Sequence, residues 1–323
     1  MGVSDTVDPA DTVVGALCGF HAVHTLKYAW PCQYQERRSA GRTGCWLPGR
    51  NGERVGGMND TTAQDPQPKK ILLVSAHPEP RSLNAGLTAF AADHLRAAGH
   101  EVRVSDLYAM KWKAVLDADD FPDHPGDRRL DVMNASERAT LAGRLAPDIA
   151  AEQEKVRWSD AVILQFPMWW FSTPAILKGW IERVFTSGFG YGPALPPPYS
   201  EDPLGGRRAL VSVTAGARAS AFSDRGIHGE LADVLHPLQH GLFWFTGMAP
   251  LDPFVMYDAN EVSEEEFAAA KLAYGQRLDG LFTDEPVPYR TLVGGDYGRD
   301  MRLLPGVEAP GTSGLGLHVR PRG

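Results

Sequence analysis

The chain has 323 residues, of which 43% are hydrophobic and 22% charged, and its formal net charge is −8. This composition is typical of a globular protein that is long enough to bury a sizeable core. The acidic balance argues against nucleic acid or an anionic membrane surface as a partner. No apolar run approaches the roughly 20 residues that span a bilayer, so we expect no membrane insertion.

The three cysteines, Cys18, Cys32 and Cys45, all lie within the first 57 residues. The rest of the chain therefore has no disulfide framework, no thiol catalysis and no cysteine metal site, and no other metal site is predicted. This usage of cysteine favours a cytoplasmic protein.

The N-terminal segment differs in composition from the rest of the chain. Its Arg, Gly and Pro residues follow no helical or strand period, and we expect a divergent, disordered extension over residues 1–68. Two alternatives stay open: Met58 is the true start, or residues 1–57 are a genuine disordered tail. We expect one main domain over residues 69–285 and a small C-terminal extension over 286–323.

The first predicted unit after the extension is strand, loop, helix, strand. Residues 71–76 (ILLVSA) form a short apolar run, typical of a strand buried on both faces. Asn84 is the predicted cap of a helix over 85–98, which Gly99 ends, and residues 101–105 alternate as a second strand. Such a unit starts a parallel sheet.

The following segments repeat this alternation. The structure of 111–146 is left open, and the Thr173–Pro174 pair is predicted to cap a helix that ends near residue 185. Ser263 and Glu266 form a capping box for a helix to about residue 281. Further helices are expected over 147–159 and 231–245, and strands over 161–166, 209–214 and 251–257. The pattern predicts an α/β doubly wound parallel sheet with helices on both faces.

Ligands of such sheets bind beyond the carboxyl ends of the strands, and three predicted strand ends have unusual sequence. Residues 77–84 are polar and precede a helix N-terminus, where phosphate can bind, although an ordinary capped turn is the alternative. Residues 167–171 contain three consecutive aromatics, which fit a flat ring or pad the core. Residues 214–217 are small enough for a close backbone approach.

Several motifs, taken together, resemble a known family. They are SDLYAM at 105–110, PDI at 147–149, AEQ at 151–153, QFP at 165–167, PAILKGW at 174–180, ERVF at 182–185 and GIHG at 226–229. In order and spacing they resemble the FAD-dependent NAD(P)H:quinone oxidoreductases, which have a flavodoxin-like fold. The similarity runs from about residue 70 to residue 283, and residues 1–57 have no counterpart.

The resemblance implies a homodimer with active sites at the interface, FAD as cofactor (FMN is less favoured), and NAD(P)H as hydride donor to a quinone or similar aromatic acceptor. It implies that the flavin is held by a loop, an aromatic segment and a small-residue stretch. The matching residues are His77, Arg81, Ser82, Leu83 and Asn84; Pro167, Met168, Trp169, Trp170 and Phe171; Thr214, Ala215, Gly216 and Ala217; and Phe222.

The resemblance also implies roles in catalysis and substrate binding. His228 matches the active-site histidine and is the candidate donor or proton source. The implied cycle is ping-pong, with hydride passing to the flavin and then to the acceptor from one pocket. The residues matching the substrate pocket are Trp170, Phe171, Tyr191 and Phe245.

Some positions depart from the family pattern. Phe222 replaces a Tyr that pairs with the histidine, Trp169 replaces a Gln, Pro193 a Tyr, and Ala217 a Gly. Loss of a charge-assisted hydrogen bond worth about 1.5–3 kcal/mol slows flavin reduction roughly ten- to a hundredfold unless water or Arg218 substitutes. A second hypothesis stays open, because some relatives are flavin-binding ancillary regulators of potassium-efflux systems.

Overall fold

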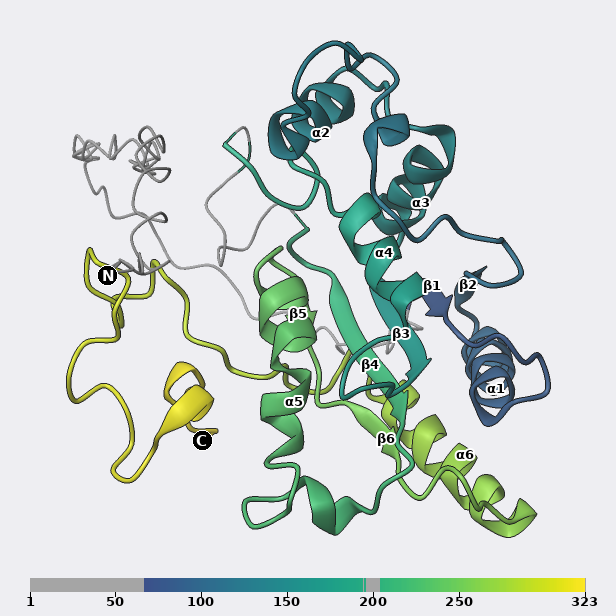
Figure 1. The fold of residues 1–323 in the computed structure, drawn as a ribbon. Coiled ribbons are helices and arrows are strands. Elements are labelled where there is room, and N and C mark those ends of the chain that lie inside the picture. The colour runs from purple at the N-terminus through teal and green to yellow at the C-terminus, as the bar shows by residue number, and fades with distance from the viewer. Residues whose placement is uncertain (1–66, 194, 196–203, 323) are drawn as a thin grey trace, which may run out of the picture. The chain divides into compact units, whose positions relative to one another are not determined.

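The computed structural model describes residues 67–193, 195 and 204–322 (Figure 1). The expectations for the N-terminal extension, including the alternatives at Met58, lie outside these residues. The described strands are β1 Lys70–Ser75, β2 Glu101–Asp106, β3 Ala161–Pro167, β4 Arg208–Thr214, β5 Ala249–Pro250 and β6 Phe254–Met256. The α-helices are α1 Leu83–Ala97, α2 Val132–Leu141, α3 Pro147–Trp158, α4 Ala175–Val184, α5 Leu231–Leu238 and α6 Glu264–Asp279.

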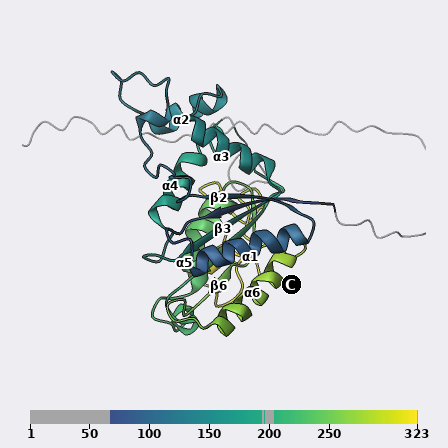
Figure 2. The same ribbon diagram turned by 90° about the vertical axis from the view of Figure 1, so that its right-hand side faces the viewer.

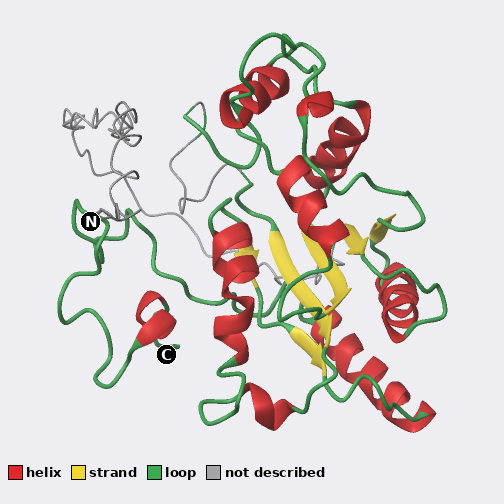
Figure 3. Cartoon of the chain, in the orientation of Figure 1, coloured by secondary structure: helices red, strands yellow, loops and turns green. Residues whose placement is uncertain are grey.

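The strands form one parallel sheet in the order β2-β1-β3-β4-β5, with β6 also paired to β4. Because β1 lies between β2 and β3, the strand order reverses at the β1–β3 pair, where ligands bind in sheets of this kind. Figure 3 shows the sheet surrounded by helices. The predicted doubly wound α/β fold is confirmed.

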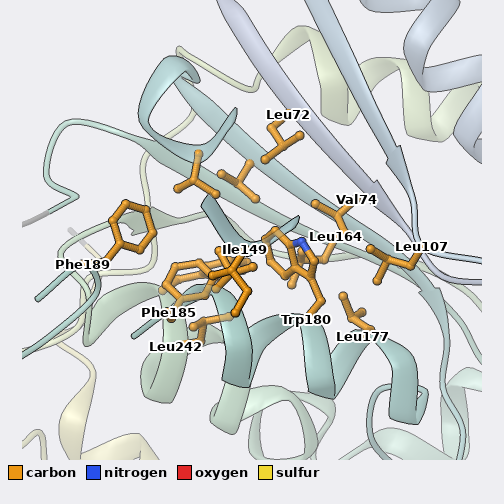
Figure 4. Close-up of a cluster of buried hydrophobic side chains, with 14 of the residues drawn as sticks. Leu72, Val74, Leu107, Ile149, Leu164, Leu177, Trp180, Phe185, Phe189 and Leu242 are labelled. Carbon is orange, nitrogen blue, oxygen red and sulfur yellow. The ribbon is translucent and has the colours of Figure 1, made fainter. Parts of the chain in front are cut away.

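Alternate residues of the strands belong to two separate hydrophobic clusters, one on each face of the sheet. Ile71 and Leu73 of β1 pack with α1 and α6, whereas Leu72 and Val74 pack with α3, α4 and α5. Figure 2 shows α1 and α6 side by side, and Figure 4 shows the second cluster around Trp180. This alternation is why the strand sequences are apolar throughout.

Two predicted helix caps are wrong. Helix α1 begins at Leu83, and its cap is Ser82, whose side chain accepts a hydrogen bond from the Ala85 N–H. Asn84 is inside the helix and only 3% exposed, because its amide is used in the core. Helix α4 begins at Ala175 after Pro174, and the buried Thr173 hydroxyl has no hydrogen-bond partner within the described part of the chain.

Other predicted elements are corrected in extent. The segment left open contains α2 and the 3-10 helix η1 (Ala118–Asp120). The helix expected over 231–245 is α5 followed by a π-helix, η3, at Gln239–Trp244. Pro237 lies inside α5 and lacks the N–H that continues the hydrogen-bond ladder. Of the strand expected over 251–257, only β6 at Phe254–Met256 forms, and the unpredicted short strand β5 precedes this range at Ala249–Pro250. The capping box of α6 is confirmed.

The segment after α6 crosses α5 and η3. Arg290 anchors it, since its buried guanidinium donates to Leu317 O at 2.9 Å, to Val307 O at 2.8 Å and to Asp296 at 3.0 Å. The ring of Tyr289 lies 5.0 Å from that of His240, edge to face. Among the described residues, the helices include none that is both long and apolar enough to cross a membrane.

Candidate active site

A cavity of about 230 Å³ opens at the carboxyl ends of β1, β3 and β4. Loops that are far apart in sequence meet there because parallel strands end at the same edge of the sheet. The predicted residues that line it are His77, Ser82, Leu83, Asn84, Pro167, Met168, Trp169, Thr214 and Gly216. Ala259 and Asn260, which follow β6, also line the cavity and were not predicted.

The N-terminus of α1 faces this cavity. Backbone N–H groups in the first helical turn have no acceptor within the helix, so they and the helix dipole attract an anion. Arg81 does not point to the cavity: its guanidinium bonds the Glu79 carboxylate at 2.8 Å, and its side chain is 87% exposed. This pairing lowers the pKa of the Glu79 carboxyl through its hydrogen bonds with Arg81.

A buried chain of side-chain hydrogen bonds fixes the floor of the cavity. The Asn84 amide donates to the Thr214 hydroxyl at 2.8 Å and accepts from Gln165 at 2.9 Å. Gln165 in turn accepts from Ser212 at 2.6 Å. Since these residues come from α1, β3 and β4, the chain locks the first turn of α1 to two strands.

The aromatic segment forms a tight two-residue turn. The backbones of Trp169 and Ser172 exchange hydrogen bonds of 3.1 and 3.0 Å. Between them, Trp170 and Phe171 have φ angles of 52° and 57°. Aromatic residues rarely adopt such angles, and the turn costs about 1–2 kcal/mol for each. Trp170 is 95% exposed and Phe171 50% exposed, so buried packing does not account for the strain.

The small-residue stretch after β4 permits a close approach. A Cβ atom added to Gly216 would lie 2.6 Å from the Asn260 amide nitrogen, so a larger residue here would displace the Asn260 side chain. The Ala215 N–H donates to Met256 O at 2.8 Å and the Ala217 carbonyl accepts from Asp258. The Ala215 N–H is therefore not available to a ligand.

An aromatic cluster surrounds the predicted catalytic histidine. The ring of His228 lies 4.8 Å from that of Phe171 and 5.1 Å from that of Phe222. Tyr257 directly follows β6 and was not predicted as a site residue. Its ring centroid lies 5.9 Å from that of Phe222, and burial raises the pKa of the Tyr257 hydroxyl. Arg218 is 84% exposed beside Asp258, 3.7 Å away, in an orientation that provides no bond to His228.

Tyr191 and Phe245 form a separate pair, with ring centroids 6.3 Å apart. Burial and the charge of Glu137 raise the pKa of the Tyr191 hydroxyl. Neither residue lines the cavity beside α1. The structure thus brings most of the predicted residues into three sets within one chain: the cavity, the cluster at His228, and this pair. Arg81, Trp170, Ala215 and Ala217 belong to none of these sets.

Comparisons with known proteins agree with this arrangement. A family model described as flavodoxin-like fold matches residues 69–278. The ribosyldihydronicotinamide dehydrogenase-like protein traD of Penicillium crustosum is 42% identical over 260 residues, which are 78% of this chain and 96% of the relative. NAD(P)H dehydrogenase [quinone] 1 of Rattus norvegicus is 36% identical, over 68% of this chain and 80% of the relative. The chain belongs to the flavodoxin-like quinone oxidoreductases.

A solved structure supports placement in this quinone oxidoreductase family. A Klebsiella pneumoniae protein named as a candidate quinone reductase has a TM-score of 0.74 and 45% identity, covering 78% of this chain and 100% of that chain. A weaker match is an Enterobacter ancillary protein of the glutathione-regulated potassium-efflux system, 37% identical over 41% of this chain and 70% of the relative.

Proposed function

We propose that this protein is an NAD(P)H-dependent flavoprotein that reduces quinones, or related electrophilic acceptors, by two-electron hydride transfer through FAD in a ping-pong cycle. The observation that carries this proposal is the cavity at the β1–β3 reversal. It combines a helix N-terminus with a strained aromatic turn in a member of the quinone oxidoreductase family.

The residues of the site fit a flavin. The first turn of α1 provides N–H groups for a phosphate, and Pro167, Met168 and Trp169 offer an apolar surface to a flat ring. Gly216 and Asn260 line the same cavity in close contact. When bound, the flavin supplies the hydride chemistry, and the protein supplies orientation and electrostatics.

His228 is the proposed catalytic residue, as hydrogen-bond donor or proton source for the reduced acceptor. Phe171 and Phe222 hold its imidazole from two sides. Its loop conformation depends on the two flanking glycines: a Cβ atom on Gly226 would lie 2.3 Å from Ala221 O, and Gly229 has a φ of 73°. Because Phe222 has no hydroxyl, the hydrogen bond implied for the family is missing on that side.

We propose FAD in preference to FMN, and a homodimer with Tyr191 and Phe245 completing the partner's site. Family resemblance supports both, and the exposure of Trp170 supports the second. Two kinds of nicotinamide hydride donor are candidates. The name of one relative specifies ribosyldihydronicotinamide, and the name of the other specifies NAD(P)H. NADH, NADPH and dihydronicotinamide riboside should therefore be compared as donors.

The alternative function is a flavin-binding regulator of a potassium-efflux system. Its support is the Enterobacter relative, whose match covers only 41% of this chain. The enzyme is favoured because the matches to proteins named as quinone dehydrogenases or reductases cover 68% and 78% of the chain.

Purification followed by a quinone assay tests the proposal. We expect a yellow protein that releases FAD on denaturation, elutes as a dimer and oxidises NAD(P)H with a simple benzoquinone. A colourless protein that stays so after incubation with FAD or FMN would overturn the flavoprotein assignment. A flavin-loaded protein that reduces no quinone would favour the regulator.

A further inference from the structure

Asn260, in the loop after β6, brings a polar side chain to the cavity beside α1. The Ala259 N–H donates to Ala215 O at 3.0 Å, which joins this loop to the stretch after β4. The amide of Asn260 therefore packs closely on the backbone of Gly216. Asn260 is exposed, and its side chain makes no hydrogen bond to the described residues. It thus offers two N–H donors and one carbonyl acceptor to a ligand.

The first turn of α1 brings free N–H groups to the same cavity. Its cap, Ser82, accepts from the Ala85 N–H with its side chain at 3.1 Å and from the Gly86 N–H with its carbonyl at 2.9 Å. The N–H groups of Leu83 and Asn84 have no acceptor in the part of the chain that the structure describes. Free N–H groups at the start of a helix attract anions.

Thr214 connects Asn260 to this helical turn. The side chain of Asn84, in the first turn, donates to the Thr214 hydroxyl at 2.8 Å, and Thr214 lies two residues before Gly216. The cavity is also small, about 230 Å³, and one of about 150 Å³ already admits a benzene ring. Donors from α1 and from Asn260 can therefore reach the same small group of a ligand.

The cavity offers hydrogen-bond donors rather than charges. Among the described residues that line it, none is Asp, Glu, Lys or Arg. The guanidinium of Arg81 binds the carboxylate of Glu79 at 2.8 Å instead. An anion in this cavity is consequently held by neutral N–H groups. Hydrogen bonds to a charged acceptor are stronger than those to a neutral one, so one additional N–H donor has a measurable effect on affinity.

We propose that Asn260 is a cofactor-binding residue, whose amide donates to the flavin phosphate at the first turn of α1. This assignment rests on the proposed function, since it takes the cofactor to be a flavin that carries phosphate. FMN and FAD both have this phosphate, and riboflavin has the same ring system without it. Asn260 should therefore contribute to the binding of FMN and FAD and not to that of riboflavin.

Flavin titration of the full-length protein, after removal of the flavin with which it is purified, tests the assignment. Flavin fluorescence reports binding, so the readout does not depend on turnover. We expect Asn260→Ala to weaken FMN and FAD about tenfold, the effect of one lost hydrogen bond. Asn260→Asp should weaken them about a hundredfold, because a carboxylate has no N–H and repels phosphate. The affinity for riboflavin should be unchanged in both variants.

Ala219→Asp is the matched control. Ala219 is exposed in the 3-10 helix η2 (Ala219–Phe222) and does not line the cavity, so this variant adds the same charge outside it and should retain flavin affinity. Equal FMN affinity in Asn260→Asp and the wild type, equal losses for riboflavin and FMN, or equal losses in Asn260→Asp and Ala219→Asp would overturn this assignment alone. A wild-type protein that binds no flavin would overturn both the assignment and the proposed function.

Discussion

Two tryptophans ten residues apart have opposite environments. Trp180 in α4 is fully buried, with its indole N–H donating to Glu152 at 2.9 Å and its ring edge to face with Phe185. Trp170 is 95% exposed in a turn with a positive φ. The first gains stability from burial and a satisfied polar group, and the second is held at a cost. The comparison shows that buried packing stabilises the framework, whereas the edge of the sheet keeps a conformation that buried packing does not stabilise.

Removing the buried tryptophan tests the framework side of this comparison and has the largest expected effect. Trp180→Ala should lower the free energy of unfolding by about 4 kcal/mol, because it opens a cavity and leaves the buried Glu152 carboxylate with one donor fewer. Urea unfolding measures the change. Trp180→Phe is the control, and its loss should be clearly smaller. A loss below about 1 kcal/mol for the alanine variant would contradict the assigned role.

Changing the proposed catalytic residue tests the functional side. His228→Ala should slow flavin reduction by NAD(P)H about a hundredfold while flavin content stays unchanged. Stopped-flow absorbance gives the rate, and release of the flavin gives the content. An unchanged rate would show that His228 has no part in the reaction.

Phe222→Tyr tests the role of His228 from the other direction. It adds a hydroxyl to a ring whose centroid lies 5.1 Å from that of His228. We expect roughly tenfold faster flavin reduction, since a hydrogen bond to a charged group is worth about 1.5–3 kcal/mol and part of this gain is lost to desolvation. The rate of Phe222→Tyr in the His228→Ala background is the control, and there the gain should vanish.

The histidines under the C-terminal segment extend the comparison to pH. Burial, together with the charges of His236 and His318, lowers the pKa of His240 to about 4. An unfolded histidine titrates near pH 6.5, so the unfolded state binds the proton first as pH falls. Stability is therefore complete above about pH 6.5 and declines towards pH 4, by on the order of 2 kcal/mol after solvent screening.

Urea unfolding at pH 7, 5.5 and 4.5 measures this decline, and His240→Gln should remove part of it. The same decline in the variant would show that other groups cause it. The stacked neighbour His236, 4.6 Å away, also has a lowered pKa through burial and should contribute to what remains.

Relieving the turn has the smallest expected effect and the opposite sign. Trp170→Asn with Phe171→Gly introduces the pair that such turns favour, and should raise the free energy of unfolding by about 1–2 kcal/mol. Flavin affinity and quinone turnover should both fall. A double variant that loses stability would mean that the turn is not strained, and would break the contrast with Trp180.

The layered fold was predictable because each buried strand is a short apolar run followed by a clear helix signal. The residues that cap the helices were harder to predict. Ser82 and Asn84 are both good cap residues, and the choice between them depends on the bonds of Asn84 to Gln165 and Thr214, which are distant in sequence. The π-helix likewise depends on how Pro237 and the turns after it pack.

The candidate site was predictable where one loop carries the signal and not where two loops meet. The motifs around His77, Trp169 and Thr214 fall on three strand ends, and the structure brings them to one cavity. Asn260 and Tyr257 lie after a strand whose ends were misplaced. The sequence offers no signal for Asn260, because its contact with Gly216 joins two loops that meet only in the folded structure.

The two-residue turn has a consequence for changing the acceptor preference of this protein. Its shape is held by the backbone bonds between Trp169 and Ser172, and its two side chains face outward. Trp170 is 95% exposed, so exchanging its side chain gives up little buried surface, whereas Phe171 also packs against the rings of His228 and Phe222. A substitution at Trp170 can therefore change the surface offered to an electron acceptor while the turn and the buried core keep their contacts.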